Sequence, residues 1–154
     1  NVNQILQGQT DGKLTTKGIE QAKGLRDKLA NKHFDAILSS DLQRAVDTAM
    51  ILNEPHHLNI EHTKLLRERN WGDFTGRFIP DIQEEKFPDN VEPIDEMFSR
   101  AMNFLTFIKT TYRDQNVLAI GHGLFNRCIQ AAYHKKTIHD IPRMVNAEVR
   151  ILEL

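Results

Sequence analysis

The fold of this chain is decided by the stretch Val117-Leu118-Ala119-Ile120-Gly121-His122-Gly123. Its four apolar residues fit a short strand that is buried on both faces of a parallel sheet, and a histidine between two glycines follows at once. Residues 124–133 then repeat apolar side chains with helical spacing, so His122 is predicted to lie on a strand-to-helix turn. In open α/β sheets such turns lie at the carboxyl edge, where the next helix offers free N–H groups to an anion. The alternative interpretation makes His122 merely a turn residue at the edge of the core.

The composition indicates one globular domain. Of the 154 residues, 27% are charged and 40% apolar, and the formal net charge is −1. This balance excludes a basic tail for nucleic acid and the charge excess typical of disorder. The single cysteine, Cys128, lies on the apolar face of the helix predicted over residues 124–133, so it is expected to pack as a small hydrophobic residue. Without a second thiol no disulfide can form, and no apolar run or signal-peptide pattern indicates a membrane, so we expect a reducing, cytoplasmic compartment.

Helical and strand patterns alternate along the chain and predict a layered α/β domain with a largely parallel sheet. Apolar stripes predict helices over residues 16–31, 42–52 and 94–112. Compact or alternating apolar runs predict further strands over residues 34–38, 58–60 and 146–152. Between these elements, residues 1–12 are predicted to form an irregular loop, and residues 77–93 are either a flap over the site or a plain connecting loop.

Polar residues gather where the predicted strands end. Ser39-Ser40-Asp41 follows one strand and offers caps to the next helix, whose first turn carries Arg44. A cation there opposes the helix dipole at a cost of about 0.3–1 kcal/mol. This favours an anion shared between Arg44 and the helix N–H groups, although a solvated arginine without a partner is the commoner case.

Glu68 lies between two arginines in an irregular segment that holds glycines and aromatic residues. Either this segment aims Glu68 into a cleft, or it forms a surface ion-pair network of little energetic value. A cationic cleft at helix N-termini suits a phosphate, and a carboxyl group beside it can protonate a leaving alkoxide. No Ser-His-Asp order, P-loop or cysteine-based phosphatase loop supplies a nucleophile. No metal is expected, because no zinc pattern matches the spacing of His56, His57 and His62.

An ordered set of motifs resembles the histidine phosphatase superfamily, with its phosphoglycerate-mutase-like fold. The motifs are Gln7-Gly8, Leu14-Thr15-x-x-Gly18-x-x-Gln21-Ala22, Ser39-Ser40-Asp41-Leu42-x-Arg44-Ala45-x-x-Thr48-Ala49, Leu66-Arg67-Glu68 with Gly72-x-Phe74-x-Gly76, and Gly121-His122-Gly123. The resemblance covers nearly the whole chain. It implies a three-layer α/β/α sandwich on a mostly parallel mixed sheet, and phosphoryl transfer through a phosphohistidine that needs neither a metal nor a cofactor.

The resemblance also implies a role for each matching residue. Arg44 would bind the phosphoryl group, Glu68 would donate a proton, and His122 would be a second active-site histidine that stabilises the transferring phosphoryl group. The substrate-binding residues that it implies are Asn1, Gln7, Gly8 and Gly123.

One part of the family pattern is not in the sequence. The nucleophile of the family lies in an Arg-His-Gly motif at the end of a central first strand, which is expected to precede Asn1 by a few residues. The chain is therefore interpreted as a single domain, residues 1–154, that is incomplete at its N-terminus. Leaving out a central strand would open a gap in the core, and even one large-to-small core change costs about 2–5 kcal/mol.

Three functions compete on this basis. The favoured one is a phosphatase that hydrolyses small phosphomonoesters, because residues 77–116 are short and show little of the basic insertion that the resemblance implies for a mutase. The second is a phosphoglycerate mutase, and the third is a non-catalytic member of the fold that binds a phosphorylated ligand or a protein partner. We expect a small phosphorylated metabolite as the partner, with neither nucleic acid nor a membrane, and leave an oligomer open.

Overall fold

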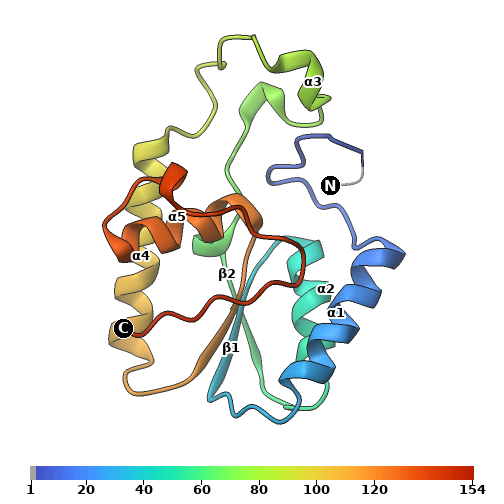
Figure 1. Ribbon diagram of the computed structural model, residues 1–154, viewed down its shortest axis with the longest axis vertical. Helices are drawn as coiled ribbons and strands as arrows, with labels where there is room; N and C mark the ends of the chain where they lie inside the picture. Colours follow the sequence, from blue (N-terminus) through green and yellow to red (C-terminus); the bar gives the residue numbers. More distant parts are fainter. Residues whose placement is uncertain (1–2) are drawn as a thin grey trace.

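Three parallel strands lie at the centre of the computed structural model, which describes residues 3–154 (Figure 1). β1 (Ala36–Ser40) pairs with β2 (Ile60–Thr63) on one side and with β3 (Val117–Ile120) on the other, which gives the order β2-β1-β3. Because these strands are parallel, their carboxyl ends meet at one edge of the sheet. The structure therefore confirms the predicted α/β fold on a parallel sheet.

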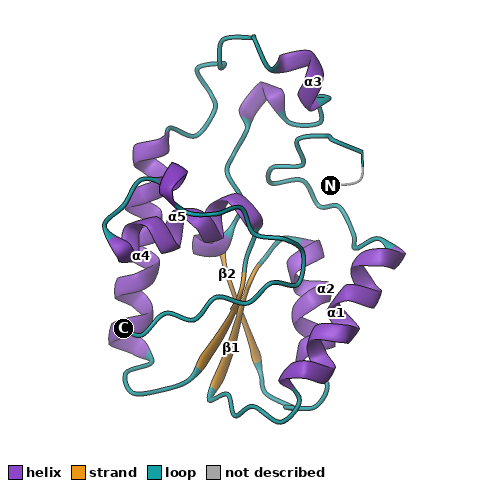
Figure 2. Cartoon of the chain, in the orientation of Figure 1, coloured by secondary structure: helices purple, strands orange, loops and turns teal. Residues whose placement is uncertain are grey.

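Helices cover both faces of this sheet (Figure 2). α1 (Thr16–Leu29) and α2 (Gln43–Asn53) lie on one face, whereas α4 (Ile94–Thr111) and α5 (Gly123–His134) lie on the other. The shorter elements are α3 (Ile79–Ile82) and the 3₁₀ turns Lys64–Leu66, Gly72–Phe74 and Ile138–Asp140.

Two apolar clusters hold the layers together, and adjacent residues of β1 divide between them. Ile37 points to the side of α1 and α2, and Leu38 points to the side of α4 and α5, because successive side chains of a strand face opposite ways. The cluster around Ile37 contains Leu29, Ala45, Ala49, Leu52, Leu118 and Ile120. The cluster around Leu38 contains Leu66, Met97, Ala101, Phe104, Leu105, Phe125, Cys128, Ile129 and Ile138. Cys128 is fully buried there, as predicted, and burial raises the pKa of its thiol to about 11.

The four long helices lie close to their predicted positions and β3 lies at the predicted residues, whereas α3 was not predicted and the boundaries of β1 and β2 differ from the prediction. The Thr15 hydroxyl accepts a hydrogen bond from the Gly18 N–H and starts α1, which ends at Leu29, two residues short of the predicted end. Ser39 and Ser40 belong to β1 itself, although a turn was predicted for them. The strand predicted over residues 58–60 lies at Ile60–Thr63 instead, because the side chain of Asn53 binds both backbone groups of Leu58 and holds that residue in the irregular segment before the strand.

The strand predicted over residues 146–152 is wrong. This segment runs across the structure without pairing to a described strand, and Ile151 is 82% exposed. It is held by side chains instead: the Tyr133 hydroxyl donates to the Glu153 carbonyl, and Arg150 donates to the side chain of Gln130. Alternation of apolar and polar residues makes a strand possible, but only a neighbouring strand can satisfy its backbone groups.

Residues 146–152 pair with no described strand because they do not reach the free edge of β3. Among the described strands β3 pairs with β1 alone. A cavity of about 1670 Å³ lies along its other edge, and β3, α1 and residues 144–152 all line it. The cavity thus separates the free edge from the segment that was expected to be a strand. Among residues 3–154, no helix is long and apolar enough to cross a membrane.

Candidate active site

His122 lies where β3 ends and α5 begins, as the sequence predicted. It is the N-cap residue of α5 and is only 7% exposed, and its Nε2 atom has no hydrogen-bond partner among the described residues. Burial lowers the pKa of His122 to about 3, and the positive charges of Arg44 and Arg100 act in the same direction. The imidazole is therefore neutral at physiological pH, with one polar nitrogen left to pair with a ligand.

Glu68 reaches the N-terminus of the same helix from the loop after β2. Its carboxylate accepts hydrogen bonds from the backbone N–H groups of Arg69, Leu124 and Phe125, at 2.9, 3.2 and 3.1 Å. Burial raises the pKa of Glu68, while these N–H groups and the charge of Arg44 act to lower it. The free N–H groups of α5 were predicted to bind an anion, and the structure shows that a side chain of the protein itself takes up two of them.

Arg44 lies in the first turn of α2, and its guanidinium group turns towards the N-terminal loop. Nη1 donates to the carbonyl of Thr10 at 2.9 Å and Nη2 to the carbonyl of Gly8 at 2.7 Å. Gly8 has a φ of +50° and packs against Trp71, so a side chain at that position would be strained. Burial lowers the pKa of Arg44, and the negative charge of Glu68 acts to raise it.

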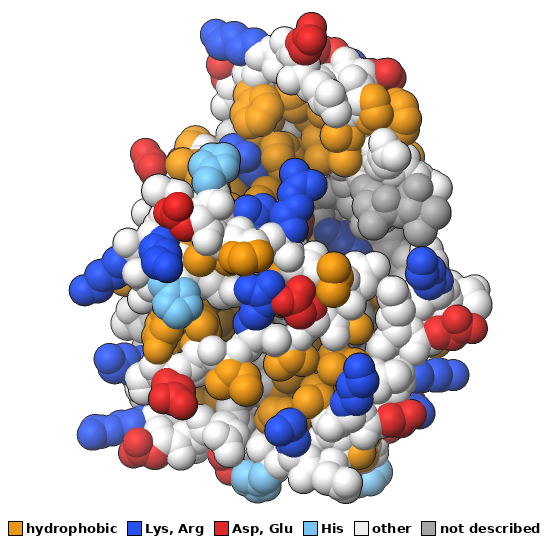
Figure 3. All heavy atoms as spheres, in the orientation of Figure 1, with side chains coloured by type: hydrophobic (Ala, Val, Ile, Leu, Met, Phe, Trp, Pro, Cys, Tyr) orange, Lys and Arg blue, Asp and Glu red, His pale blue; other side chains and the backbone are white. Residues whose placement is uncertain are grey.

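One cavity unites these side chains. Arg44, Glu68 and His122 line it, and so do the predicted binding residues Gln7, Gly8 and Gly123. It is continuous with the space along the free edge of β3. Figure 3 shows Lys and Arg side chains gathered in a hollow beneath the uppermost segment of the molecule, where hydrophobic side chains border it. Asn1, the remaining predicted residue, lies outside the described residues.

The hydroxyl groups at the end of β1 take no part in this cavity. Ser39 and Ser40 are fully buried, and neither is among the residues that line it. The Ser40 hydroxyl accepts from the backbone N–H of Leu42, and the Ser39 hydroxyl lies 2.8 Å from Nδ1 of His62. They stabilise the turn between β1 and α2. Within residues 3–154, no group of three or more His, Cys, Asp or Glu side chains is arranged to hold a metal ion.

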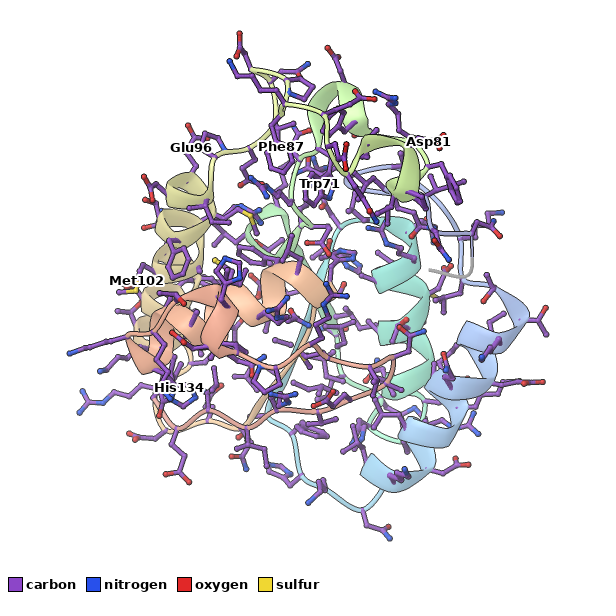
Figure 4. The ribbon with its side chains drawn as sticks, turned by 45° about the horizontal axis from the view of Figure 1, so that its top comes forward. Trp71, Asp81, Phe87, Glu96, Met102 and His134 are labelled. Carbon is purple, nitrogen blue, oxygen red and sulfur yellow. The ribbon has the colours of Figure 1, made fainter. Side chains whose placement is uncertain are left out.

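Sequence reasoning missed the side chains that support the site. Arg67 makes a two-pronged ion pair with Asp41, at 2.7 Å for each prong, and so ties the end of β1 to the loop that carries Glu68. Trp71 lines the cavity, and its ring lies 6.0 Å from that of Phe87 (Figure 4). Arg100 of α4 reaches the carbonyl groups of Leu65 and Arg67. Such contacts join residues far apart in the chain, and no spacing in the sequence signals them.

Comparisons with known proteins agree with this geometry. The family model described as histidine phosphatase superfamily (branch 1) matches residues 1–154. A Bacillus subtilis protein named uncharacterized phosphatase PhoE is 33% identical over 127 residues, which are 80% of this chain and 65% of that protein. The adenosylcobalamin/alpha-ribazole phosphatase of Escherichia coli is 27% identical over 136 residues, 79% of this chain and 67% of that protein. The solved structure of Bacillus stearothermophilus YhfR has a TM-score of 0.88 at 26% identity and covers 96% of this chain and 81% of that one.

Proposed function

Because this chain belongs to the histidine phosphatase superfamily, we propose that it is part of a phosphatase that hydrolyses small phosphomonoesters through a phosphohistidine. The chain spans only about two thirds of the length of the curated relatives that it matches, 65% in the first case and 67% in the second. The observation that carries the proposal is that Arg44, Glu68 and a neutral His122, whose Nε2 has no partner among the described residues, line one cavity. A cation, a buried carboxyl group and a free imidazole nitrogen suit a phosphoryl group and a leaving alkoxide.

Each of these residues has a distinct proposed role. Arg44 binds the phosphoryl oxygens, and its two present acceptors are backbone carbonyls, which a negatively charged oxygen outcompetes. The imidazole of His122 donates a hydrogen bond to the same group and so stabilises charge that develops in the transition state. The nucleophilic histidine attacks phosphorus and forms a P–N bond while the P–O bond to the leaving group breaks, and Glu68, whose pKa is raised by burial, gives its proton to the leaving oxygen. Water then attacks phosphorus and passes a proton to the Glu68 carboxylate, and the P–N bond breaks, which frees the histidine and releases inorganic phosphate. Gln7, Gly8, Gly123 and Asn1 are proposed to line the substrate site.

The proposed nucleophile is the histidine of an Arg-His-Gly motif that precedes residue 1. We propose that its strand lies along the free edge of β3. Support comes from the cavity there, which runs from the edge of β3 to His122. A parallel strand in that position would end at the carboxyl edge of the sheet, next to Arg44 and Glu68. It would also give residues 146–152 a neighbouring strand, which they lack among the described residues.

The substrate class follows from the same considerations. Relatives in this family include an adenosylcobalamin/alpha-ribazole phosphatase and a phosphoserine phosphatase, which are named for small phosphorylated substrates. We propose a small phosphorylated metabolite for this protein as well. A phosphoglycerate mutase would require a bisphosphate to prime it, so a rate that rises only when a bisphosphate is added would overturn the proposed hydrolysis.

The test traps the intermediate in the natural protein. We expect rapid acid-free quenching with a ³²P-labelled phosphomonoester to give a phosphoenzyme that is stable to alkali and labile to acid, as a phosphohistidine is.

Arg44→Ala should lower kcat/KM by about 10²-fold, as the loss of a preorganised charge donor does. The matched control is Arg127→Ala, because Arg127 bonds the carbonyls of Ile138 and Ile141 and does not line the cavity among the described residues. Turnover without a phosphoenzyme, or equal losses in the two variants, would contradict the proposal.

A further inference from the structure

Residues 71–91, here called the flap, leave and rejoin the rest of the chain at a neck, and residues 76–79 of the flap also bond the backbone of residues 4–6. Asn70 and Glu92 form this neck, because the Asn70 N–H donates to the Glu92 carboxylate at 2.9 Å and the Glu92 N–H donates to the Asn70 carbonyl at 2.8 Å. Nε of Arg69 donates to the Glu92 carbonyl, also at 2.9 Å. The residue after Glu68 is thus fastened to the far end of the flap.

Arg100 locks this neck from α4. Its Nε and Nη2 atoms donate to the two carboxylate oxygens of Glu92, at 3.0 and 2.9 Å. Its Nη1 atom donates to the carbonyls of Leu65 and Arg67, at 3.1 and 2.6 Å. The side chains of Arg100 and Glu92 are only 17% and 12% exposed. An ion pair so buried, with its donors used on both sides, has one well-defined geometry.

Arg100 restrains both sequence neighbours of Glu68, one of them directly and the other through Glu92. The carbonyl of Arg67, directly before Glu68, accepts from Arg100, and Arg69, directly after it, is fixed to Glu92. The guanidinium carbon of Arg100 also lies 3.8 Å from the ring centroid of Phe125, whose backbone N–H binds the Glu68 carboxylate. Arg100 therefore restrains both the loop that carries this carboxylate and the helix turn that receives it.

We infer that Arg100 is a positioning residue for Glu68, acting through its bonds to Glu92 in the neck and to the carbonyl of Arg67. The inference rests on the proposed function, in which Glu68 is the proton donor. Arg100 is not among the described residues that line the cavity of Glu68 and His122. It therefore acts without touching the substrate. Because misplacing a catalytic group by about 1 Å can cost about 10²-fold in rate, such a restraint has a large effect on catalysis.

The geometry separates this role from a mere contribution of charge. A lysine at position 100 keeps the positive charge, but its single ammonium group cannot bond both oxygens of Glu92 and the two carbonyls as the planar fork of arginine does. Arg100→Lys thus removes the restraint and leaves the electrostatics nearly intact. Arg77→Lys is the matched control, because Arg77 makes a two-pronged pair with Glu85 on the exposed side of the flap.

The experiment compares these variants of the natural protein on an alkyl phosphate and on p-nitrophenyl phosphate, whose leaving group needs no proton. We expect Arg100→Lys to lower kcat/KM for the alkyl ester by about tenfold or more and to change the aryl rate by less than about threefold, the same split that Glu68→Gln should produce. When Arg100→Lys is combined with Glu68→Gln, it should lower kcat/KM for the alkyl ester almost no further than Glu68→Gln alone does. Equal losses on both esters, additive losses, or no loss would overturn the inference.

A second measurement keeps this test independent of activity. The N–H groups of Arg69, Leu124 and Phe125 bind the Glu68 carboxylate. When the variants are made in the natural protein, we therefore expect hydrogen exchange at these groups to be faster in Arg100→Lys than in Arg77→Lys. Unchanged exchange overturns the inference. Absence of any phosphoenzyme in the unmutated protein overturns the proposed function instead, and the exchange result still decides whether Arg100 positions Glu68.

Discussion

His122 and Glu68 illustrate how burial sets the chemistry of single residues in this protein. Both lie at the N-terminus of α5, where a helix favours negative charge. Burial disfavours a protonated imidazole, and the positive charges of Arg44 and Arg100 act in the same direction, so the pKa of His122 falls to about 3. For Glu68 burial raises the pKa, against the pull of its N–H partners. The histidine is therefore held neutral beside a carboxyl group that accepts a proton more readily than usual.

The state of His122 makes the protein sensitive to acid. Because burial lowers the pKa of His122 from 6.5 to about 3, the unfolded chain binds a proton there between these pH values and the folded chain does not. His122 should thus lower the free energy of unfolding by about 1.4 kcal/mol for each pH unit as the pH falls through this range. Urea unfolding near pH 4 and near pH 7 measures the effect, and His122→Gln should lose less stability on acidification than the unmutated protein.

The exposed His134 provides the control for this measurement. His134→Gln should retain the full acid sensitivity. If His122→Gln and His134→Gln respond to pH alike, His122 is not the residue responsible.

The helices were predictable at the scale of single elements because each carries its own stabilising pattern. Their apolar stripes face the two clusters, and the cap at Thr15 is local in sequence. Strands depend on partners, so local pattern misplaced the bounds of β1 and β2, although it placed β3 correctly. The correct position of β2 is decided by its register with β1, where Ile60 lies beside Ile37.

Asn53 connects α2 to β2 and should be important for stability. Its side chain accepts from the N–H of Leu58 at 2.9 Å and donates to the carbonyl of the same residue at 2.6 Å. We expect Asn53→Ala to lower the free energy of unfolding by about 1–3 kcal/mol, because both backbone groups of Leu58 lose a partner. Asn103→Ala, at an exposed position in α4, should change it by less than about 0.5 kcal/mol. Chemical denaturation of both variants checks this, and equal effects would contradict the role given to Asn53.

The cavity along β3 concerns the molecule as a whole. It is bordered by both the sheet and residues 144–152, and it leads into the candidate active site. In our proposal one strand completes the sheet and delivers the nucleophile, so stability and catalysis depend on the same segment. Intact mass and N-terminal sequencing of the natural protein test directly whether that segment exists.

We further expect material spanning residues 1–154 alone to lack a cooperative thermal transition, in contrast to a natural protein that holds the additional strand. The reason is that β3 and residues 144–152 border a cavity of about 1670 Å³ and lack packing on the sides that face it. Differential scanning calorimetry of the two proteins makes the comparison. A stable, cooperatively folded monomer of residues 1–154 would show that the sheet needs no further strand.

The sequence by itself determined the α/β class, the order of the helices and the position of His122 between β3 and α5. Apolar periodicity and helix caps depend on residues close together in the chain, so they can be read from the sequence alone. Only the tertiary structure decided that the N–H groups of α5 bind Glu68, that residues 146–152 form no strand, and that Arg100 fastens the neck of the flap. The physical reason is that a hydrogen bond or ion pair between distant segments depends on how the layers pack, which no local spacing encodes.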